Sequence, residues 1–575
     1  MGVPRSFNFA DVWEMAADAV PSREALVVGE QRRTYAQLEE RANRLANHFT
    51  ALGVGPGDHV ALYLENCAEY VEAMLALFKL RAVPINVNHR YVADELRYLL
   101  DNSDSVGVLT QPSLRPTVDA VGGARRDGVR FVVSTGEDYE AALASASVNR
   151  PAVERSGDDR YLIYTGGTTG LPKGVTWRQE DAFFVCMGGG DPLRLQGPVE
   201  RPDQLPGRML DQPTCYLPVA PMMHAAAQWT SFSWFFAGSK VVLMPGSLDP
   251  AAVWQAIEGE GVNVVTVVGD AVARPLLDEW DAAIAAGRSY DASSLFVFSN
   301  GGAPLSASAK QRVFTALPNV MLTDGFGSSE AGTQGASRLT AADVAAELGN
   351  ERGAGGAATT DDPVGSSGTT SRLVRFDQPA KPTIVVGPDG DEVAPGSGVV
   401  GQVLAGGRLP IGYYKDPERT SAAFVERDGG RWLVTGDMAT VEADGSIALL
   451  GRGSGAINTG GEKVFAEEVE GVLKAHPAVY DCVVVGVADD RWGSAVTAVV
   501  QPEPDAAVAL DDLVAHCKER IAGYKAPKRL VVVDRVVRSP SGKPDYRWAK
   551  DVATGAALRR PHDDQLPAPG LEVTS

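Results

Sequence analysis

The chain has 575 residues, more than one hydrophobic core normally serves, so at least two domains are expected. Hydrophobic residues make up 44% of the sequence and charged residues 22%, proportions that are typical of a folded protein and argue against general disorder. The formal net charge of -20 repels polyanions on average, which argues against a nucleic-acid partner but leaves room for a pocket that binds a small anion.

The sequence shows no pattern for entering or crossing a membrane. The N-terminus lacks an apolar signal core, and no apolar run approaches the roughly 20 residues that span a bilayer. The first six residues formally fit a myristoylation pattern, against which Pro4 argues. Scattered cysteines, odd in number, indicate reduced thiols; they are Cys67, Cys186, Cys215, Cys482 and Cys517. We expect a cytoplasmic protein without stable membrane insertion, and a homodimer is one assembly that the sequence leaves open.

The first hundred residues alternate between helical and strand patterns, and the alternation returns after residue 240. Such alternation is typical of a layered α/β domain. The expected elements are helices at 41–52, 69–80 and 250–260, and strands at 60–64, 83–87, 240–244 and 262–268. A stretch rich in Gly, Thr and Ala at 349–371 interrupts the pattern, and we expect it to be a mobile surface loop.

A second, smaller unit of α+β type is expected after residue 452. Its predicted elements are helices at 464–475 and 510–521 and strands at 480–487, 496–501 and 529–533. The expected division is an N-terminal domain at 1–451, a hinge at 452–455, a mobile C-terminal domain at 456–555 and a flexible tail at 556–575.

The most informative segment runs from Tyr164 to Val175. Three glycines and three threonines precede Lys173, so the backbone can turn tightly around phosphate oxygens while hydroxyls and an ammonium group bind them. The spacing fits neither the common NTPase loop nor the dinucleotide fingerprint. A flexible hairpin without a ligand is the alternative. The expected phosphate-binding residues are Thr165, Gly166, Gly167, Thr168, Thr169, Gly170 and Lys173.

With this segment the sequence resembles the adenylate-forming superfamily, which includes acyl-CoA synthetases, luciferases and adenylation domains of peptide synthetases. The resemblance extends from about residue 10 to residue 550, and further motifs follow in the superfamily's order. It implies a large N-terminal layered α/β domain and a small mobile α+β C-terminal domain. It also implies ATP, Mg²⁺ and coenzyme A as cofactors and a carboxylic acid as substrate.

Two segments resemble the loops that enclose the adenine. Asn300-Gly-Gly-Ala-Pro304 would lie along the flat face of the purine. Asp324-Gly-Phe-Gly-Ser-Ser-Glu330 departs from the usual Tyr-Gly-x-Thr-Glu pattern, with Phe and Ser in place of Tyr and Thr, and a phenyl ring still stacks on adenine. The residues implied to bind the nucleotide here are Gly301, Gly302, Ala303, Pro304, Asp324, Gly325, Phe326, Gly327, Ser328 and Ser329.

The resemblance also assigns charged residues to the reaction. Glu330 is the implied ligand of Mg²⁺, because a hard cation prefers oxygen donors. Asp437, in Thr435-Gly-Asp437, matches the aspartate that binds ribose, and Arg452 would add a second contact to ribose or phosphate. Lys543, in Ser539-Pro-Ser-Gly-Lys543, resembles the lysine that assists adenylation. The implied catalytic residues are Lys543, Glu330, Lys173 and Thr165.

In the superfamily the small domain rotates about a hinge between two half-reactions. Ser454 stands at the pivot, where an Asp or Lys is usual, and glycines flank it. The loop after the hinge is implied to line the tunnel for the thiol arm of coenzyme A. Its residues are Thr459, Gly460, Gly461, Glu462 and Lys463.

The acid substrate is expected to be bulky. Residues 265–275 and 177–181 resemble actinobacterial acyl-CoA ligases for steroid side chains and related polycyclic acids, and small residues near the implied pocket would leave room for a rigid acid. His224 resembles a residue that gates the acid in the superfamily, with a helix-terminal histidine as the alternative reading. The expected acyl-pocket residues are His224, Trp229, Val268, Gly269, Gly301 and Gly325.

The resulting hypothesis is an ATP-dependent acyl-CoA ligase that forms an acyl-adenylate and then a thioester. A long-chain fatty acid is the alternative substrate. Two alternative functions stay open: a ligase that performs thioester formation alone on an acyl-adenylate from a partner enzyme, and an adenylation enzyme that loads a carrier protein. The missing carrier domain argues against the last. A non-catalytic binding protein is disfavoured because the sequence keeps the residues implied to do the chemistry, namely Lys173, Glu330, Asp437 and Lys543.

Overall fold

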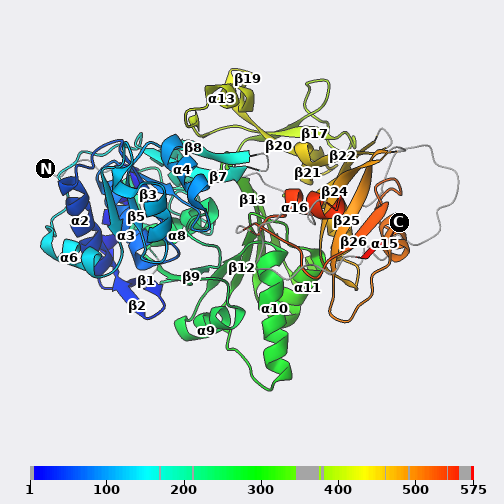
Figure 1. Ribbon diagram of the computed structural model, residues 1–575, viewed down its shortest axis with the longest axis horizontal. Helices are drawn as coiled ribbons and strands as arrows, with labels where there is room; N and C mark the ends of the chain where they lie inside the picture. The colour runs from blue at the N-terminus through cyan, green and yellow to red at the C-terminus, as the bar shows by residue number, and fades with distance from the viewer. Residues whose placement is uncertain are drawn as a thin grey trace.

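Two lobes of unequal size make up the protein, and the chain passes from one to the other at the short helix η4 (Gly453–Gly455). The structure is a computed structural model that describes residues 6–167, 170–209, 213–344, 375–376, 381–459, 462–489, 492–539, 542–555 and 572–574. Figure 1 shows the small lobe, orange to red, beside the green helices α10 and α11 of the large lobe. The expected α/β class, with a large N-terminal and a small C-terminal part, is confirmed.

A four-stranded parallel sheet, ordered β4-β3-β5-β6, forms the N-terminal layer of the large lobe. Its strands are β3 (His59–Tyr63), β4 (Val83–Asn86), β5 (Ser105–Thr110) and β6 (Phe131–Ser134). The helices of this region are α2 (Tyr35–Ala51), α3 (Ala68–Lys79), α4 (Ala93–Asn102), α5 (Arg115–Ala120), α6 (Glu137–Ser145) and η1 (Gly123–Arg125). Buried β-branched and aromatic residues make β3 a strand covered on both faces.

An eight-stranded sheet, ordered β14-β13-β12-β11-β9-β10-β1-β2, is the second layer. Its strands are β1 (Glu24–Val28), β2 (Gln31–Thr34), β9 (Cys215–Pro218), β10 (Lys240–Leu243), β11 (Val264–Val267), β12 (Val297–Gly301), β13 (Met321–Ser328) and β14 (Gly332–Leu339). The helices are α1 (Phe9–Ala19), α7 (Gln179–Val185), α8 (Ala225–Phe236), α9 (Pro250–Glu260), α10 (Asp270–Ala285), α11 (Ala307–Ala316), η2 (Pro202–Gln204) and η3 (Pro206–Arg208). Strands β9, β11, β12 and β13 are parallel, so their carboxyl ends lie along one edge.

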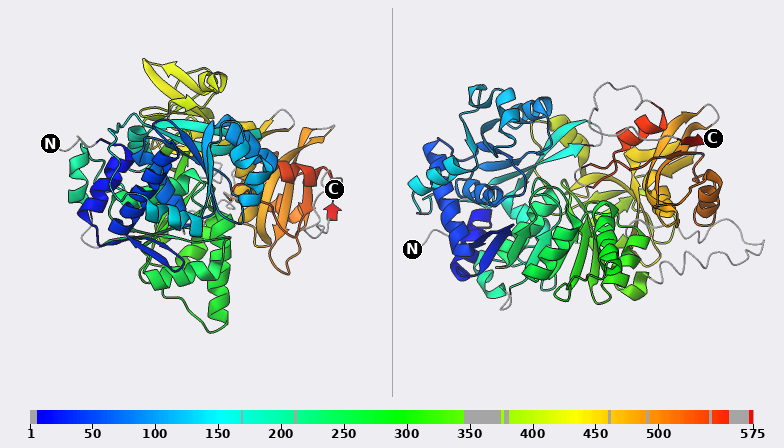
Figure 2. Two further views of the ribbon diagram at one scale, coloured as in Figure 1. Left: turned by 60° about the vertical axis from the view of Figure 1, so that its left-hand side comes forward. Right: turned by 60° about the horizontal axis from the view of Figure 1, so that its bottom comes forward.

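Two antiparallel sheets complete the large lobe. A three-stranded sheet contains β7 (Arg160–Gly167), β8 (Gly170–Arg178) and β18 (Gly412–Tyr413). A six-stranded sheet contains β15 (Arg375–Phe376), β16 (Thr383–Val386), β17 (Gly401–Ala405), β19 (Phe424–Arg427), β20 (Gly430–Val441) and β21 (Ile447–Arg452), with helix α13 (Pro417–Ala423) beside it. The two views in Figure 2 show this yellow sheet between the N-terminal layers and the small lobe.

The small lobe has its own sheet and its own core. Its elements are β22 (Ala456–Thr459), β23 (Glu462–Phe465), α14 (Ala466–Lys474), β24 (Val479–Asp489), β25 (Gly493–Pro502), α15 (Leu510–Lys518), β26 (Arg529–Val532), α16 (Tyr546–Ala553) and β27 (Glu572–Thr574). Strands β24 to β27 form a four-stranded sheet in chain order. Valines on the two faces of β24 and β25 contribute to two separate buried clusters, which explains how about 100 residues form a stable unit.

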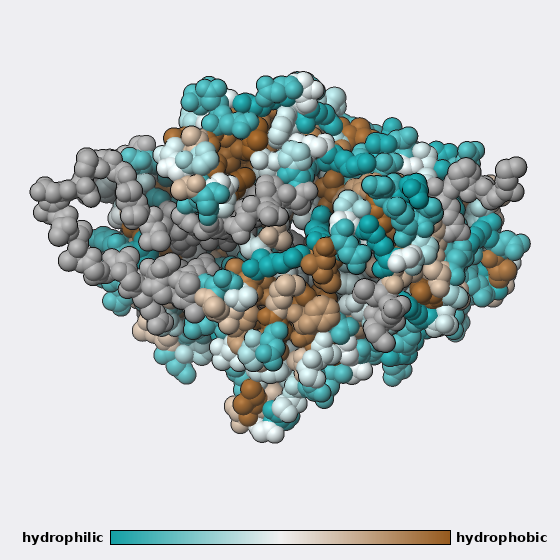
Figure 3. Space-filling view, turned by 180° about the vertical axis from the view of Figure 1, so that it is seen from behind, coloured by the Kyte–Doolittle hydropathy of each residue, from teal (hydrophilic) through white to brown (hydrophobic). Residues whose placement is uncertain are grey.

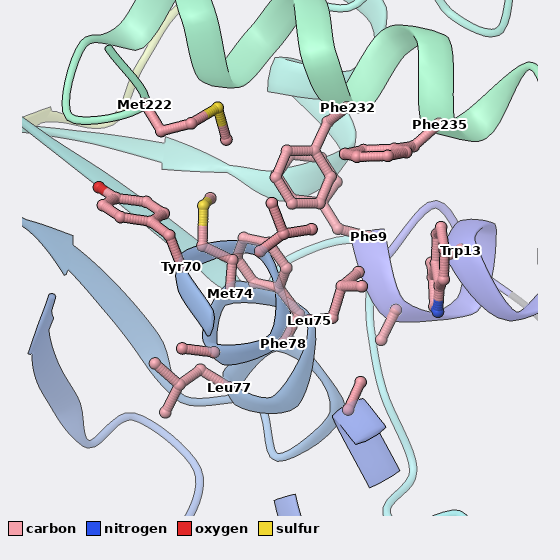
Figure 4. Packing of buried hydrophobic residues seen from close by; sticks show 14 of the residues in the cluster. Phe9, Trp13, Tyr70, Met74, Leu75, Leu77, Phe78, Met222, Phe232 and Phe235 are labelled. Carbon is pink, nitrogen blue, oxygen red and sulfur yellow. The ribbon is translucent and has the colours of Figure 1, made fainter. Parts of the chain in front are cut away.

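Aromatic residues join the helices beneath the N-terminal layers. Figure 4 shows Phe9 of α1, Phe78 of α3 and Phe232 of α8 meeting in one buried cluster. The ring centroids of Phe9 and Phe78 are 5.1 Å apart and those of Phe78 and Phe232 are 5.9 Å apart, both in edge-to-face arrangements. Burial of each such ring stabilises the fold by about 1.5–3 kcal/mol, so this cluster fixes α8 and the strands that it follows.

Most predicted elements are present, with differences at their ends. The helix predicted at 41–52 begins earlier, at Tyr35, because Thr34 and Gln37 form a capping box. The helix predicted at 464–475 begins at Ala466, because Val464 and Phe465 belong to β23, and the helix predicted at 510–521 ends at Lys518. Within the tail that was expected to be flexible, 572–574 pair with β26 as strand β27. The loop expected at 349–371 lies outside the described residues.

The surface and the cysteines agree with a folded protein in contact with water. Seen from behind in Figure 3, hydrophobic residues gather near the middle of the molecule and hydrophilic ones cover much of its rim. Among the described residues, no helix combines the length and apolar character that crossing a bilayer requires. All five cysteines carry free thiols.

Candidate active site

The carboxyl edge of the eight-stranded sheet brings together segments that are far apart in the sequence. Strands β9, β11, β12 and β13 end there, and the residues that follow them include His224, Gly269, Pro304 and Ser329. Ligands of open α/β sheets bind outside the carboxyl ends of the strands, so this edge is the expected place for a site.

The glycine- and threonine-rich segment forms the hairpin of β7 and β8 beside this edge. Thr165 is paired with Lys173 and Gly167 with Gly170, and Thr168 and Thr169 lie outside the described residues. The backbone of Tyr164 accepts and donates hydrogen bonds with the Asn86 side chain at 2.8 and 2.7 Å. These bonds fix the base of the hairpin to the N-terminal layer.

Lys173 and Glu330 meet at the site as a hydrogen-bonded ion pair, Nζ to Oε1, of 2.9 Å. The Tyr413 hydroxyl lies between them, accepting from Lys173 at 3.1 Å and donating to Glu330 at 3.2 Å. Burial pushes the pKa of Glu330 upward, but Lys173 outweighs that effect, so the pKa is lower than usual and the carboxylate is ionised. The structure thus joins two of the four expected catalytic residues.

Sequence reasoning did not identify Tyr413. It reaches the site because β18 pairs with β8, residue by residue at Gly412–Thr176 and Tyr413–Val175. The ammonium group of Lys173 also lies 4.4 Å from the centre of the Tyr413 ring. A short aromatic segment at 411–414 was the available signal, but it matches no motif that names a partner.

The two loops expected to enclose the adenine are tied to each other. Asn300 donates to Asp324 Oδ1 at 2.7 Å and accepts from the Gly269 backbone at 2.7 Å. The other carboxylate oxygen of Asp324 pairs with Lys310 at 3.0 Å. Asp324 therefore holds the two loops together through Asn300. Its expected contact with a nucleotide stays a prediction. Gly269 has a φ of 57°, and a Cβ there would lie 2.6 Å from the Pro304 carbonyl oxygen, so only glycine fits.

Phe326 lies near the end of β13, and Ser329 and Glu330 lie in the turn between β13 and β14. Phe326 is partly exposed and packs against the buried cluster of the six-stranded sheet. The indole of Trp177 on β8 donates to the Ser329 carbonyl at 3.0 Å. This bond fixes the turn relative to the β7–β8 hairpin, which carries Lys173. Glu330 is thereby held next to Lys173.

Asp437 and Arg452 are direct cross-strand neighbours on β20 and β21. Their charged groups are 3.6 Å apart, Nε to Oδ1. Burial raises the pKa of Asp437, while Arg452 opposes the rise. Because the chain enters the small lobe directly after Arg452, this pair lies at the junction of the two lobes.

Lys543 comes to the same place from the small lobe. Its turn rests on the large lobe so closely that a Cβ on Gly542 would lie 2.9 Å from the Val268 carbonyl oxygen. The Lys543 side chain keeps contact with solvent, and enclosure by the two lobes lowers its pKa, as does Arg452, against the opposing effect of Glu330 and Asp437. The ammonium group of one lobe is thus influenced electrostatically by carboxylates of the other.

The expected acyl-pocket residues are gathered around the sheet edge in two groups. Gly301 and Gly325 are register partners on β12 and β13, so two adjacent strands lack side chains at the same level. Trp229 and Val268 are buried in one hydrophobic cluster. His224 directly precedes α8 and follows Met223, whose carbonyl accepts from Asn86 at 2.7 Å; its gating role stays a prediction.

The residues expected to line a coenzyme A tunnel lie on the β22–β23 hairpin of the small lobe. Thr459 is buried, Glu462 and Lys463 are exposed, and Gly460 and Gly461 lie outside the described residues. Ser454, the expected pivot, has its backbone in η4. In this arrangement the small lobe packs the turn of Lys543 against Val268 of the large lobe, while Glu462 and Lys463 of the hairpin face solvent.

Glu330 can contribute to binding a divalent cation, although only together with other ligands. The described residues hold no group of three or more side chains suited to a metal ion. Mg²⁺ is commonly held by one or two carboxylates and by phosphate oxygens of the substrate. The single ionised carboxylate of Glu330, beside the β7–β8 hairpin, fits that donor set.

Comparisons with known proteins agree with this geometry. A family profile described as AMP-binding enzyme matches residues 13–414, and one described as AMP-binding enzyme C-terminal domain matches residues 468–543. A 3-oxocholest-4-en-26-oate–CoA ligase of Rhodococcus rhodochrous is 45% identical over 563 residues, covering 95% of this chain and 96% of the relative.

A second relative, from Mycolicibacterium smegmatis, is named a ligase for medium- and long-chain fatty acids and for 3-oxocholest-4-en-26-oate. It is 43% identical over 574 residues, covering 97% of this chain and 98% of the relative. Among solved structures, an anthranilate–CoA ligase in complex with anthranoyl-AMP is similar with a TM-score of 0.78 and 21% identity. That match covers 97% of this chain and 100% of the other.

Proposed function

Because the chain belongs to the family of AMP-binding enzymes, we propose that it joins a bulky hydrophobic carboxylic acid to coenzyme A through an acyl-adenylate. The acid is of the polycyclic steroid type. The observation that carries the proposal is the close packing of Gly542, directly before Lys543 of the small lobe, against Val268 at the carboxyl edge of the large lobe's sheet. An acid–thiol ligase of this kind needs a cation there only for the step that consumes ATP.

In the first step the carboxylate of the acid attacks the α-phosphorus of ATP and displaces pyrophosphate. Lys173 and the backbone of the β7–β8 hairpin bind the departing phosphates, and Asp437 accepts hydrogen bonds from the ribose hydroxyls. Lys543 offsets the negative charge that grows on the α-phosphate and orients the attacking oxygen. Glu330 would hold Mg²⁺, which supplies charge neutralisation for the phosphates.

In the second step the thiol of coenzyme A attacks the acyl carbonyl and displaces AMP. No nucleophile of the protein is required, because the mixed anhydride already activates the acyl group. The small lobe must then withdraw Lys543 and deliver the β22–β23 hairpin, whose exposed Glu462 and Lys463 are free to approach the large lobe.

Two observations support the steroid type of acid. The two relatives described above both have 3-oxocholest-4-en-26-oate in their names, and each match extends over nearly the whole chain. The paired glycines 301 and 325 also leave the sheet edge free of side chains, as a rigid ring system requires.

A medium- or long-chain fatty acid is the second candidate substrate, because the Mycolicibacterium relative is named for both classes. The packing of the Lys543 turn against Val268 of the large lobe favours a ligase that also performs adenylation, since thioester formation does not use this lysine. An enzyme that loads a carrier protein would perform the same second step, but the attacking thiol would belong to the carrier protein instead of coenzyme A.

The test measures both half-reactions on steroid, fatty and diterpenoid acids. We expect acid-dependent exchange between ATP and pyrophosphate and acyl-CoA formation, with the highest kcat/KM on a steroid acid such as 3-oxocholest-4-en-26-oate. Higher kcat/KM on fatty acids than on steroid acids would contradict the substrate class. Thioester from synthetic acyl-adenylate, with none from acid and ATP, would contradict the two-step function.

Replacing Tyr413 with phenylalanine should lower the rate of adenylation about three- to tenfold. The change removes the hydroxyl between Lys173 and Glu330 but leaves their 2.9 Å ion pair and the ring beneath Lys173. A single hydrogen bond of this kind contributes on the order of 1 kcal/mol. Pyrophosphate exchange at varied ATP measures the effect.

The neighbouring Tyr414 provides a matched control, because its hydroxyl bonds to the exposed Asp104 at 2.8 Å, away from Lys173 and Glu330. Tyr414→Phe should leave exchange within about twofold of the wild type, as is usual for a surface substitution. Equal losses in the two variants would show that the Tyr413 hydroxyl has no special part in adenylation.

A further inference from the structure

One face of helix α10 in the large lobe is devoted to contacts with the small lobe. Asp270, Arg274 and Asp278 follow one another at intervals of four residues and so lie on one side of the helix. Each makes a polar contact across the boundary between the lobes. The partners are Lys474 for Asp270, Glu503 and the Lys474 carbonyl for Arg274, and the Tyr480 hydroxyl for Asp278.

Lys474 is the centre of this boundary. Its Nζ lies 3.5 Å from Asp270 Oδ2 of the large lobe and 3.4 Å from Asp481 Oδ1 of its own lobe. The side chains of Lys474, Asp270 and Asp481 are only 8%, 2% and 9% exposed. Charges this well buried are tolerated only while they are paired, so the cluster favours the arrangement of lobes that pairs them.

Asp481 connects Lys474 to the turn that carries Lys543. Arg538 donates two hydrogen bonds to the Asp481 carboxylate, at 2.7 and 2.6 Å, in the bidentate geometry that restrains a guanidinium group most strongly. The same Arg538 donates to the Gly542 carbonyl at 3.1 Å. The Ser539 backbone closes the turn by donating to the Lys543 carbonyl at 2.8 Å.

At its other end the cluster reaches the loop expected to lie along the adenine. Asp270 Oδ1 accepts from the Ser306 backbone at 2.8 Å, two residues after Pro304. The Asp270 backbone in turn donates to the Pro304 carbonyl at 3.3 Å. A continuous series of polar contacts therefore runs from the nucleotide loop, through Asp270, Lys474, Asp481 and Arg538, to the turn of Lys543.

We propose that Lys474 is a positioning residue for the ATP-consuming half-reaction: by pairing with Asp270 across the lobe boundary and with Asp481 behind it, it holds Lys543 over the nucleotide. This inference rests on the proposed function. It identifies the contact that stabilises one of the two poses of the small lobe. When the small lobe rotates for thioester formation, the Lys474–Asp270 pair must separate, so losing it disfavours the first pose alone.

The ionisation of the cluster agrees with this role. Burial raises the pKa of Asp270 and of Asp481, yet Lys474 and the nearby guanidinium groups outweigh it, and the pKa of Asp481 falls to about 2. For Lys474, burial and Arg538 lower the pKa while the two aspartates raise it further, to above its usual value. All three groups are charged near neutral pH, so the Lys474 ammonium faces an ionised carboxylate on each side of the lobe boundary.

The experiment uses the full-length Lys474→Met variant, which keeps the length of the side chain and removes its charge. Pyrophosphate exchange should fall about ten- to a hundredfold, because displacing a catalytic group by about 1 Å costs that much. Thioester formation from supplied acyl-adenylate should stay within about twofold of the wild type. Lys474→Arg should restore most of the exchange rate, because it restores the charge opposite both aspartates.

Lys525→Met is the matched control. Lys525 is also mostly buried and pairs with a glutamate of helix α14, Glu468, at 2.6 Å, but this pair lies wholly within the small lobe. Its loss should not change the ratio of the two half-reaction rates. If Lys474→Met folds poorly, Asp270→Asn removes the same cross-boundary charge pair while keeping the shape of the side chain.

Hydrogen exchange supplies a readout that needs no substrate. In Lys474→Met and Asp270→Asn, amides at the start of α10 and the end of α14 should exchange faster than in the wild type, with the core of β24 and β25 unchanged. Parallel loss of both half-reactions, or an unchanged ratio of their rates, would overturn the proposal. If the proposed function is wrong, the wild type will show no acid-dependent exchange between ATP and pyrophosphate. The difference in amide hydrogen exchange between the variants and the wild type will then still be seen.

Discussion

Replacing Lys543 with alanine should reduce acid-dependent pyrophosphate exchange by about a hundred- to a thousandfold, the usual effect of removing one group that stabilises transition-state charge. Lys543 follows Gly542, which packs against Val268 of the large lobe, and Glu330 and Asp437 act on the pKa of Lys543 electrostatically. Thioester formation from synthetic acyl-adenylate should remain within about threefold of the wild type, because the lysine is withdrawn for that step. Pyrophosphate exchange measures adenylation, and a single-turnover assay with supplied acyl-adenylate measures thioester formation.

Lys550→Ala is the control for this variant, since Lys550 is an exposed residue on the neighbouring helix α16. It should leave both steps unchanged. If Lys543→Ala instead slows both half-reactions equally, the lysine acts on the structure or on binding as a whole, and its assignment to adenylation is wrong.

Replacing Glu330 with glutamine should lower adenylation on the order of a hundredfold and raise the Mg²⁺ concentration needed for half-maximal rate. The amide has the shape of the carboxylate but no charge. Lys173 would lose its 2.9 Å partner and the phosphates would lose the carboxylate that helps hold their cation. Exchange rates over a Mg²⁺ series, at saturating ATP and acid, measure the effect.

Glu418→Gln serves as the comparison, because Glu418 is an exposed glutamate in the first turn of α13. Its Mg²⁺ dependence should match that of the wild type. An unchanged Mg²⁺ dependence in Glu330→Gln would remove Glu330 from the metal site and leave it only a structural partner of Lys173.

Local sequence was sufficient to predict the class of fold and the segments that carry the site. The run from Tyr164 to Val175 has glycines and hydroxyls at a spacing that suits a phosphate turn, and its described residues belong to the paired strands β7 and β8. Alternating patterns placed β3, α3 and β4 to within a residue or two. Such features depend on neighbours within a few residues, which periodicity can reveal.

Contacts between distant segments could not be predicted in this way. Tyr413 reaches Lys173 across 240 positions only because β18 pairs with β8. Asp270 and Lys474 belong to different lobes, and no periodic pattern in either helix names the other as partner. The early start of α2 is a smaller case, because the capping box of Thr34 and Gln37 outweighed the weak helical pattern at 35–40.

The central claim is that one nucleotide site in the large lobe serves two poses of the small lobe. A crystal structure with a non-hydrolysable sulfamoyl analogue of a steroid acyl-adenylate tests it most directly. We expect the adenine between residues 300–304 and 324–329, the ribose on Asp437 and the ring system beside Gly301 and Gly325. An analogue bound elsewhere, or no binding in calorimetry of the same protein, would contradict the account.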